Sequence, residues 1–409
     1  MRVLAATRSG TLDVAGRRRV LVTLCVTEVT SWGVLYYAFP VLAPDIRAAT
    51  GWSLASLTAA FSSGLVVAAL VGIPVGRVLD RRGPRAVMTA GSVLAVTAVV
   101  GLATARGLVW FVGASLVAGV AMGAVLYPPA FAALTRWHGP GRVRALTALT
   151  VAGGLASTVF APVTAALSAH LDWRQVYLVL AVVLAVVTVP GHAWGLRGPW
   201  PHPDRPTRSV SHTPARVVRS RYFVALAAAL TLTAFAAFAV VVNLVPLLTE
   251  RGVGAGTAAV VLGLGGVGQV MGRLGYRPLA TRMTVRGRTV LVMAAVATAT
   301  ALLGLLTSLV ALVLATLVAG MARGILTLLQ ATAVTDRWGT AHYGRLSGVL
   351  SAPITITVAL APWGGASIAT LTGGYPAMFL VLAAIALAGT VAALASTPPA
   401  VRAAESVSS

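Results

Sequence analysis

The stretch Gly76-Arg77-Val78-Leu79-Asp80-Arg81-Arg82-Gly83-Pro84-Arg85 lies between two long apolar runs and places one acid among four arginines. The same order, an apolar run, a short arginine-rich turn and another apolar run, recurs along the chain. Apolar residues make up 58% of the 409 and charged residues only 10%, with a mean hydropathy of +0.89. This composition excludes a water-soluble globular domain.

Apolar runs separated by charged or Pro/Gly-containing breaks indicate twelve membrane spans. A helix needs about 20 apolar residues to cross a hydrocarbon layer of ~30 Å. Helices satisfy their own backbone hydrogen bonds in lipid, and the Ala, Leu and Val content favours them over a barrel. We therefore predict an all-α membrane protein with twelve transmembrane helices in two six-helix bundles. The expected spans are residues 19–43, 53–78, 86–105, 108–134, 144–169, 175–196, 222–248, 256–281, 289–306, 309–334, 345–371 and 375–396.

The formal net charge is +22, and arginine carries all of the positive charge because the chain contains no lysine. On a soluble protein such a charge would suggest nucleic-acid binding. Here the arginines cluster in alternate turns between the spans, which the positive-inside rule explains without a nucleic-acid partner. We expect the arginine-rich turns and both termini on the cytoplasmic side of the cell membrane, with membrane lipids around the helices.

A segment with five prolines, residues 197–221, divides the chain and has the composition of a flexible cytoplasmic linker. The other predicted parts are a tail over 1–18, bundles over 19–196 and 222–396, and a tail over 397–409. The bundles repeat each other, because Arg136-Trp137 and Arg144 recur as Arg337-Trp338 and Arg345 at a constant shift of 201 residues. Such internal duplication is typical of transporters with a site between the repeats.

The twelve spans, the duplication and the pattern Gly-x-x-x-Asp-Arg-x-Gly-x-Arg between spans two and three resemble the major facilitator superfamily over essentially the whole chain. One departure is Val78, where the family usually has leucine. The second copy keeps Gly272-Arg273 but has Tyr276 where an acid would match Asp80. The resemblance implies alternating access, with a gate formed by the signature residues Gly76, Asp80, Arg81, Gly83 and Arg85.

The residue types of this signature suit a gate. A glycine such as Gly76 lets two helices approach closely. Asp80, at a helix end, can accept hydrogen bonds from the start of a neighbouring helix and pair with an arginine. Such contacts would hold the cytoplasmic ends of the halves together in one state and break in the other. The alternative is a solvated basic turn that only sets the topology.

Two stretches are similar to the monocarboxylate and oxalate–formate type of transporter, namely Ser31-Trp32-Gly33-Val34-Leu35-Tyr36-Tyr37 and the region from Trp137 to Gly154. Members of that group usually carry a substrate-binding arginine in span eight, whereas this chain has Gly268-Gln269 there. The signatures of drug–proton antiporters are weak. Ser115 lies where an arginine is expected in span four, and Ala161-Pro162 replaces a Gly-Pro pair in span five.

Charges inside the hydrocarbon zone are costly and indicate function, and only Glu28 and Arg323 lie near the middle of a span. Helical spacing places Arg323, Thr327 and Gln330 on one stripe and Glu28, Trp32 and Tyr36 on another. We predict that Arg323 binds a substrate anion and that Glu28 is its counter-charge or a proton carrier. The alternative is a structural pair that holds the halves together. Further polar candidates for the cavity wall are Tyr37, Tyr127, Asn243 and Gln269.

No catalytic, metal or cofactor site is expected. Cys25 is the single cysteine and lies in the first span, so neither a disulfide nor a cysteine-based metal site can form. The six histidines show no metal spacing, and the chain has no Ser-His-Asp set or phosphate-cradling loop. The glycine-rich run Gly263–Gly268 lies inside a span, and we interpret it as helix packing.

These observations predict a monomeric carrier rather than an enzyme or a membrane-embedded sensor. Without an ATP-binding motif, its transport should be secondary-active or facilitative. The expected substrate is a small organic solute, best an organic anion such as a carboxylate, with or without a coupled proton. The alternative is an efflux carrier for amphipathic drugs or secondary metabolites.

Overall fold

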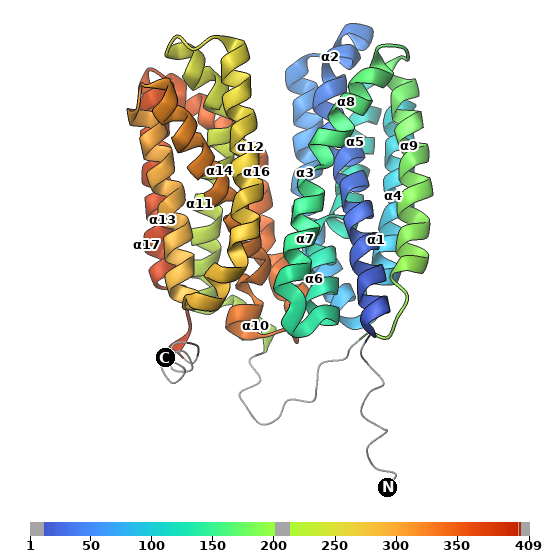
Figure 1. Ribbon diagram of the computed structural model, residues 1–409. Helices are drawn as coiled ribbons and strands as arrows, with labels where there is room; N and C mark the ends of the chain where they lie inside the picture. The colour runs from blue at the N-terminus through green and yellow to red at the C-terminus, as the bar shows by residue number, and fades with distance from the viewer. Residues whose placement is uncertain (1–11, 201–212, 400, 402–409) are drawn as a thin grey trace. The chain divides into compact units, whose positions relative to one another are not determined.

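The computed structural model describes residues 12–200, 213–399 and 401. Every regular element in these ranges is a helix, which confirms the predicted all-α class (Figure 1). Contacts among the described residues group the helices into two compact units, unit 1 and unit 2. The predicted tails over 1–18 and 397–409 and the linker over 197–221 lie partly outside the described residues, so these boundaries stay predictions.

Unit 1 contains the elements that precede the proline-rich segment. They are α1 Val14–Trp32, η1 Gly33–Tyr37, α2 Ala38–Thr50, α3 Leu54–Arg82, α4 Pro84–Ala103, α5 Leu108–Val125, α6 Tyr127–His138, η2 Gly139–Gly141, α7 Arg142–Gly154, α8 Ala156–Ser168, α9 Trp173–Pro190 and η3 Gly191–Gly195. Residues 340–352 also belong to unit 1, although in the sequence they lie between two segments of unit 2.

Unit 2 contains most of the second half of the chain. Its elements are α10 Pro214–Val218, α11 Arg221–Glu250, α12 Ala255–Arg282, α13 Val285–Leu305, α14 Leu309–Ala333, α15 Thr335–Trp338, α17 Tyr375–Leu394 and the part of α16 (Tyr343–Thr372) that follows Ala352. The sequence predicts one continuous second bundle over 222–396, whereas the first turns of α16 group with unit 1 in the structure.

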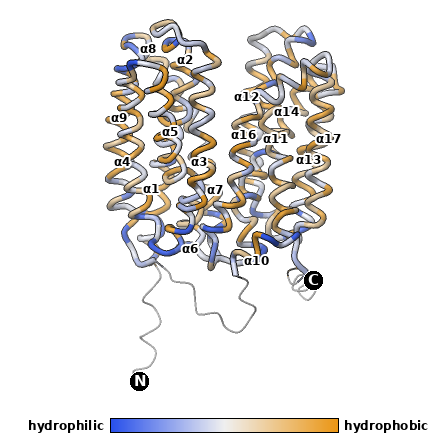
Figure 2. Tube along the Cα trace, turned by 180° about the vertical axis from the view of Figure 1, so that it is seen from behind, coloured by the Kyte–Doolittle hydropathy of each residue, from blue (hydrophilic) through white to orange (hydrophobic). Residues whose placement is uncertain are grey.

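Eleven stretches of the described chain are long and apolar enough to cross a membrane. One of them, Leu108–Ser168, has 61 residues and covers the fourth and fifth expected spans. Since one crossing takes about 20 residues, this stretch has the length for two, which is consistent with twelve spans. Hydrophobic residues run along the helices, and hydrophilic residues gather near helix ends such as α6 (Figure 2).

In unit 1, α3 and α5 pack closely through small residues. A methyl group built on Gly119 would overlap the carbonyl oxygen of Gly64. One turn further along α5, a methyl group on Gly123 would lie 2.9 Å from the carbonyl oxygen of Ala68. Glycine at these positions therefore lets the two backbones touch, as small residues do between membrane helices.

Unit 2 repeats these contacts between α12 and α14. A methyl group on Gly320 would overlap the carbonyl oxygen of Gly265, and one on Gly324 would overlap that of Gln269. Each of the four residues is shifted by 201 from its counterpart in unit 1. The duplication inferred from the sequence thus extends to individual backbone contacts.

Tyr276 does not occupy the position that corresponds to Asp80. Asp80 lies two residues before the end of α3 at Arg82, whereas Tyr276 lies six residues before the end of α12 at Arg282. Tyr276 is fully buried, and its hydroxyl forms a hydrogen bond with that of Thr332. The expected match of Tyr276 to Asp80 is therefore wrong, because Tyr276 lies one helical turn further inside its unit.

Candidate substrate and gate residues

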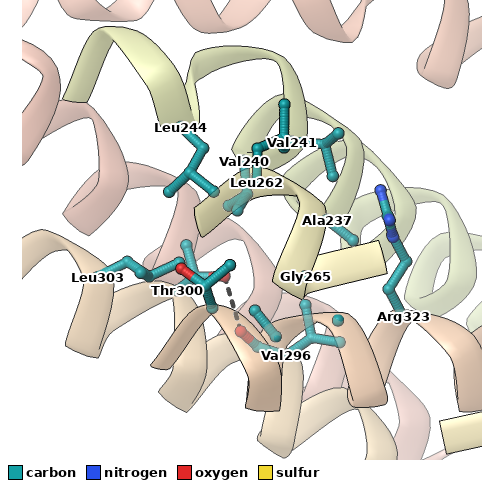
Figure 3. Close-up of a pocket in the computed structure, with 13 residues that line it drawn as sticks. Ala237, Val240, Val241, Leu244, Leu262, Gly265, Val296, Thr300, Leu303 and Arg323 are labelled. Atoms are coloured by element: carbon teal, nitrogen blue, oxygen red, sulfur yellow. Dashed lines mark hydrogen bonds between the residues drawn. The ribbon is translucent and has the colours of Figure 1, made fainter. Parts of the chain in front are cut away.

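A pocket in unit 2 has Arg323 at its edge (Figure 3). Its wall comes from α11, α12, α13 and α14, and Arg323 is the one charged residue among those that line it. Figure 3 shows Arg323 on the side of the pocket away from Leu303 and Thr300. Apart from Arg323, the lining is Ala237, Val240, Val241, Leu244, Leu262, Gly265, Val296, Thr300, Leu303, Thr316, Ala319 and Gly320. A cation beside a mainly apolar wall can orient a small organic anion.

Arg323 is half-buried on α14, and its Nη2 donates a hydrogen bond to Oε1 of Gln269 on α12 at 3.0 Å. The hydroxyl of Thr327 donates to the backbone carbonyl of Arg323 at 3.2 Å. Thr327 and Gln330 follow Arg323 along α14 but do not line the pocket. Of the stripe predicted from helical spacing, Arg323 alone therefore reaches the pocket.

Asn243, another predicted cavity residue, does not line this pocket. It is buried on α11, and its amide donates to the carbonyl of Ala239 at 2.9 Å. A methyl group built on Gly365 of α16 would collide with its Nδ2. The side chain of Asn243 thus lies between α11 and α16, where Gly365 makes room for it.

Glu28 lies in α1 of unit 1 and is completely buried. Neither carboxylate oxygen has a hydrogen-bond partner of ordinary geometry within the described residues. The neighbouring donor is the indole of Trp32, one helical turn further along α1. Buried polar groups are nearly always satisfied, so such a group calls for a functional explanation. The α-helix gives way to the π-helix η1 five residues later, at Gly33, and π-helical turns frequently occur at functional sites.

The four predicted aromatic residues of unit 1 form one cluster, the aromatic cluster of Trp32, Tyr36, Tyr37 and Tyr127. The ring centroid of Trp32 lies 5.3 Å from that of Tyr36 and 5.1 Å from that of Tyr127. Tyr36 and Tyr37 are 5.1 Å apart. All four side chains are partly exposed. The structure therefore brings the predicted aromatic residues together, and Trp32 among them lies next to Glu28.

Asp80 holds the start of α16 in unit 1. Its Oδ1 accepts a hydrogen bond from the backbone N–H of Gly344 at 3.0 Å, and its Oδ2 accepts one from the N–H of Arg345 at 2.8 Å. Amides in the first turn of a helix have no partner in the helix, and a carboxylate there also interacts favourably with the helix dipole. Asp80 thus caps the first turn of α16, although it lies far from α16 in the sequence.

Arg136 is the ion-pair partner of Asp80, with Nη2 and Oδ1 2.9 Å apart. Its guanidinium also donates to the carbonyl oxygens of Asp80 at 3.1 Å and Ala341 at 2.9 Å. The sequence predicts a gate formed by the five signature residues and uses Arg136 only as a landmark of the duplication. The signal that could have found it was its recurrence as Arg337.

The other signature residues differ in their contacts. A methyl group on Gly76 would overlap the carbonyl oxygen of Gly344, and Gly83 adopts a positive φ of 78° at the end of α3. Nε of Arg85 donates to the carbonyl of Ala193 at 2.8 Å. Arg81 is exposed and forms no hydrogen bond or ion pair in the part of the chain that the structure describes.

Among the described residues, no group of three or more His, Cys, Asp or Glu side chains could hold a metal ion. Glu28 belongs to unit 1 and Arg323 to unit 2. The idea that Glu28 is the counter-charge of Arg323 therefore stays a prediction.

Residues 21–309 match the sequence model of the Major Facilitator Superfamily. No curated protein matches the chain by sequence. The fold is similar to that of the human organic anion transporter MFSD10 (TETRAN), with a TM-score of 0.71, 18% identity, and coverage of 92% of this chain and 99% of that one. It is also similar to the E. coli fucose:proton symporter FucP, with a TM-score of 0.70, 15% identity, and coverage of 92% and 98%. At these identities the likeness concerns the fold alone.

Proposed function

Because the chain belongs to the major facilitator superfamily and is thus a multi-pass membrane transporter rather than an enzyme, we propose that it carries a small organic anion by alternating access. The observation that carries this proposal is Arg323, the one charged residue at the edge of the pocket in unit 2. A carboxylate could accept hydrogen bonds from its guanidinium in a geometry that a lysine could not offer.

The contact between Arg323 and Gln269 supports this substrate class. Transporters of the monocarboxylate type usually carry a substrate-binding arginine in the span to which Gln269 belongs. In this chain the cation comes from α14 instead, and its Nη2 contacts Gln269 Oε1 at 3.0 Å. A cation supplied by the neighbouring helix would preserve an anion site. The similarity in fold to a human organic anion transporter is compatible with this substrate but does not determine it.

The signature residues and Glu28 supply the other parts of the proposed cycle. We take the Asp80–Arg136 pair as the gate, since it holds the first turn of α16. Ionisable carboxyls inside membranes mark ion and proton pathways, so Glu28 is the group through which a proton could be coupled. The protein would act as a monomer in the cell membrane, with the arginine-rich turns and both termini on the cytoplasmic side.

The aromatic cluster favours a second candidate, export of an amphipathic cationic drug or metabolite. Aromatic faces attract cations, most strongly where water is excluded. Trp32 lies next to the buried carboxyl of Glu28, and its three tyrosine neighbours pack around it. A positively charged aromatic solute could stack on these rings and pair with that carboxylate.

Flux in proteoliposomes separates the two candidates. Purified full-length protein would be tested with labelled carboxylic acids, neutral sugars and aromatic amines, with and without an imposed pH difference. We expect saturable flux of one or more acids. Flux of amines alone would contradict the first candidate and support the second.

Arg323→Ala tests the anion site directly. We expect the KM for the transported acid to rise at least about tenfold, because a hydrogen bond to a charged group contributes about 1.5–3 kcal/mol. Arg323→Lys should retain part of the affinity. The matched control is Arg277→Ala, which removes an exposed arginine of α12 and should leave the KM unchanged. An unchanged KM in Arg323→Ala would rule out Arg323 as the anion-binding residue.

A further inference from the structure

The residues that follow η3 fold back onto the signature end of unit 1. Leu196 is almost completely buried, and the carbonyl oxygen of Pro199 accepts a hydrogen bond from the indole N–H of Trp137 at 3.0 Å. The ring of the next residue, Trp200, packs edge-on against Trp137, with centroids 5.3 Å apart and planes at 90°. The beginning of the segment that joins the two halves is therefore anchored on α6.

Trp200 also covers the Asp80–Arg136 pair. Cζ of Arg136 lies 4.9 Å from the centroid of the Trp200 ring, a cation–π contact, and the indole N–H of Trp200 donates to the carbonyl oxygen of Asp80 at 3.3 Å. A methyl group built on Gly83 would lie 3.1 Å from the ring. The second glycine of the signature thus does more than permit the positive φ, because it also makes room for Trp200.

The ring of Trp200 lies against the Asp80–Arg136 pair, and this pair holds the start of α16. Arg136 donates hydrogen bonds to the carboxylate and the backbone carbonyl of Asp80 and to the carbonyl of Ala341. The Asp80 carboxylate in turn accepts hydrogen bonds from the backbone N–H groups of Gly344 and Arg345. A ring over the guanidinium excludes water from this network, and charged hydrogen bonds are stronger where water is excluded. A substitution that removes the ring should therefore loosen the start of α16, although the substitution itself lies outside α16.

We propose that Trp200 is a positioning residue that latches the start of the linker onto the gate. The proposal rests on the gate role of Asp80 and Arg136 proposed above. The Trp200 ring lies against the guanidinium that bonds both Asp80 and the carbonyl of Ala341, so it acts on the hold on α16 through Arg136. The linker is then part of the gating apparatus rather than a passive connection.

The duplicated Arg-Trp pair supports this assignment. In unit 2 the ring of Trp338 packs against Phe223, with centroids 5.4 Å apart, where α11 begins after the linker. Trp137 therefore contacts the first residues of the linker, and Trp338 contacts the first turn of the helix that follows the linker. The arginines differ, because Nε of Arg337 donates to the carbonyl of Ser396 at 2.8 Å and Arg136 pairs with Asp80. Only the copy in unit 1 couples this contact to the signature.

Amide hydrogen exchange of the full-length protein tests the latch, read at Gly344 and Arg345, whose N–H groups donate to Asp80. We expect Trp200→Leu to speed their exchange about fivefold to tenfold, in line with the strength of a partly desolvated cation–π contact. Trp200→Phe keeps an aromatic face and should fall between Trp200→Leu and the unmodified protein. The matched control is Trp194→Leu, since Trp194 lies nearby in η3 with its side chain 58% exposed, and it should leave the exchange unchanged.

Asp80→Asn in the same assay separates the latch from the gate. If Asp80→Asn speeds exchange at Gly344 and Arg345 but Trp200→Leu does not, the latch is wrong and the gate stands. If Trp200→Leu speeds exchange equally throughout α4 and α9, the ring only supports the bundle, and the latch is also wrong. If neither variant changes the exchange, the proposed hold on α16 fails, and the latch fails with it.

Discussion

Asp80→Asn is expected to reduce transport at least a hundredfold while the protein still folds and binds its substrate. The carboxylate accepts hydrogen bonds from Gly344, Arg345 and Arg136 at 3.0, 2.8 and 2.9 Å. Asparagine keeps one acceptor and presents an N–H₂ group where the second oxygen was. Removing one partner of a buried ion pair costs about 3–5 kcal/mol, and the two side chains here are only 5% and 12% exposed. A change of this size shifts a two-state equilibrium by about a hundredfold or more.

The measurement is initial flux in proteoliposomes together with substrate binding to the same purified variant. The matched control is Arg82→Gln, which changes the charge of the neighbouring exposed turn without touching the pair. It should transport at nearly the normal rate. Normal flux through Asp80→Asn would show that the hold on α16 is not required during the cycle.

Gly119→Ala is expected to destabilise the protein by about 3 kcal/mol, within the range seen when extra atoms are forced into close packing. Its methyl group would overlap the carbonyl oxygen of Gly64 and lie 2.9 Å from the Gly64 Cα. Because both obstacles are backbone atoms, no side-chain rotation can relieve them, and α3 and α5 must separate. Thermal unfolding in detergent would report the loss.

Gly113→Ala is the control for this substitution, because it lies on the same helix and a methyl group there meets nothing within 4 Å. Alanine is the better helix former by about 1 kcal/mol, so this variant should be as stable as the unmodified protein or more so. Equal unfolding temperatures for Gly119→Ala and Gly113→Ala would contradict the close contact between the helices.

Patterns along the sequence predicted the elements that depend on local residues. Hydropathy predicted the helices, and the arginine-rich turn predicted Asp80 as a residue at a helix end. The glycine run was correctly interpreted as packing at two positions, since a methyl group on Gly268 would overlap the carbonyl oxygen of Leu317 and one on Gly265 would meet Thr316. Gly263 and Gly266 of the same run have nothing within 4 Å, so the pattern alone does not tell which glycines make contact.

Features that depend on contacts between distant residues were missed. Arg136 and Trp200 lie 56 and 120 positions from Asp80, and no periodicity links them. Likewise, the spacing of Arg323, Thr327 and Gln330 identified a helix face but not which of the three reaches the pocket. That depends on how α11, α12 and α13 surround α14, which is a property of the packed unit rather than of one helix.

The matching glycine contacts mark what the two units have in common and where they differ. Gly64 and Gly119 touch as Gly265 and Gly320 do, whereas the polar residues nearby have diverged, with Gln269 in place of Ala68 and Arg323 in place of Met122. A methyl group added to Gly119 or Gly320 would overlap a backbone carbonyl oxygen of the neighbouring helix and push the two helices apart. The close-packed helix pair is therefore a frame common to both units, whereas Arg323, proposed to select the substrate, has no counterpart in unit 1.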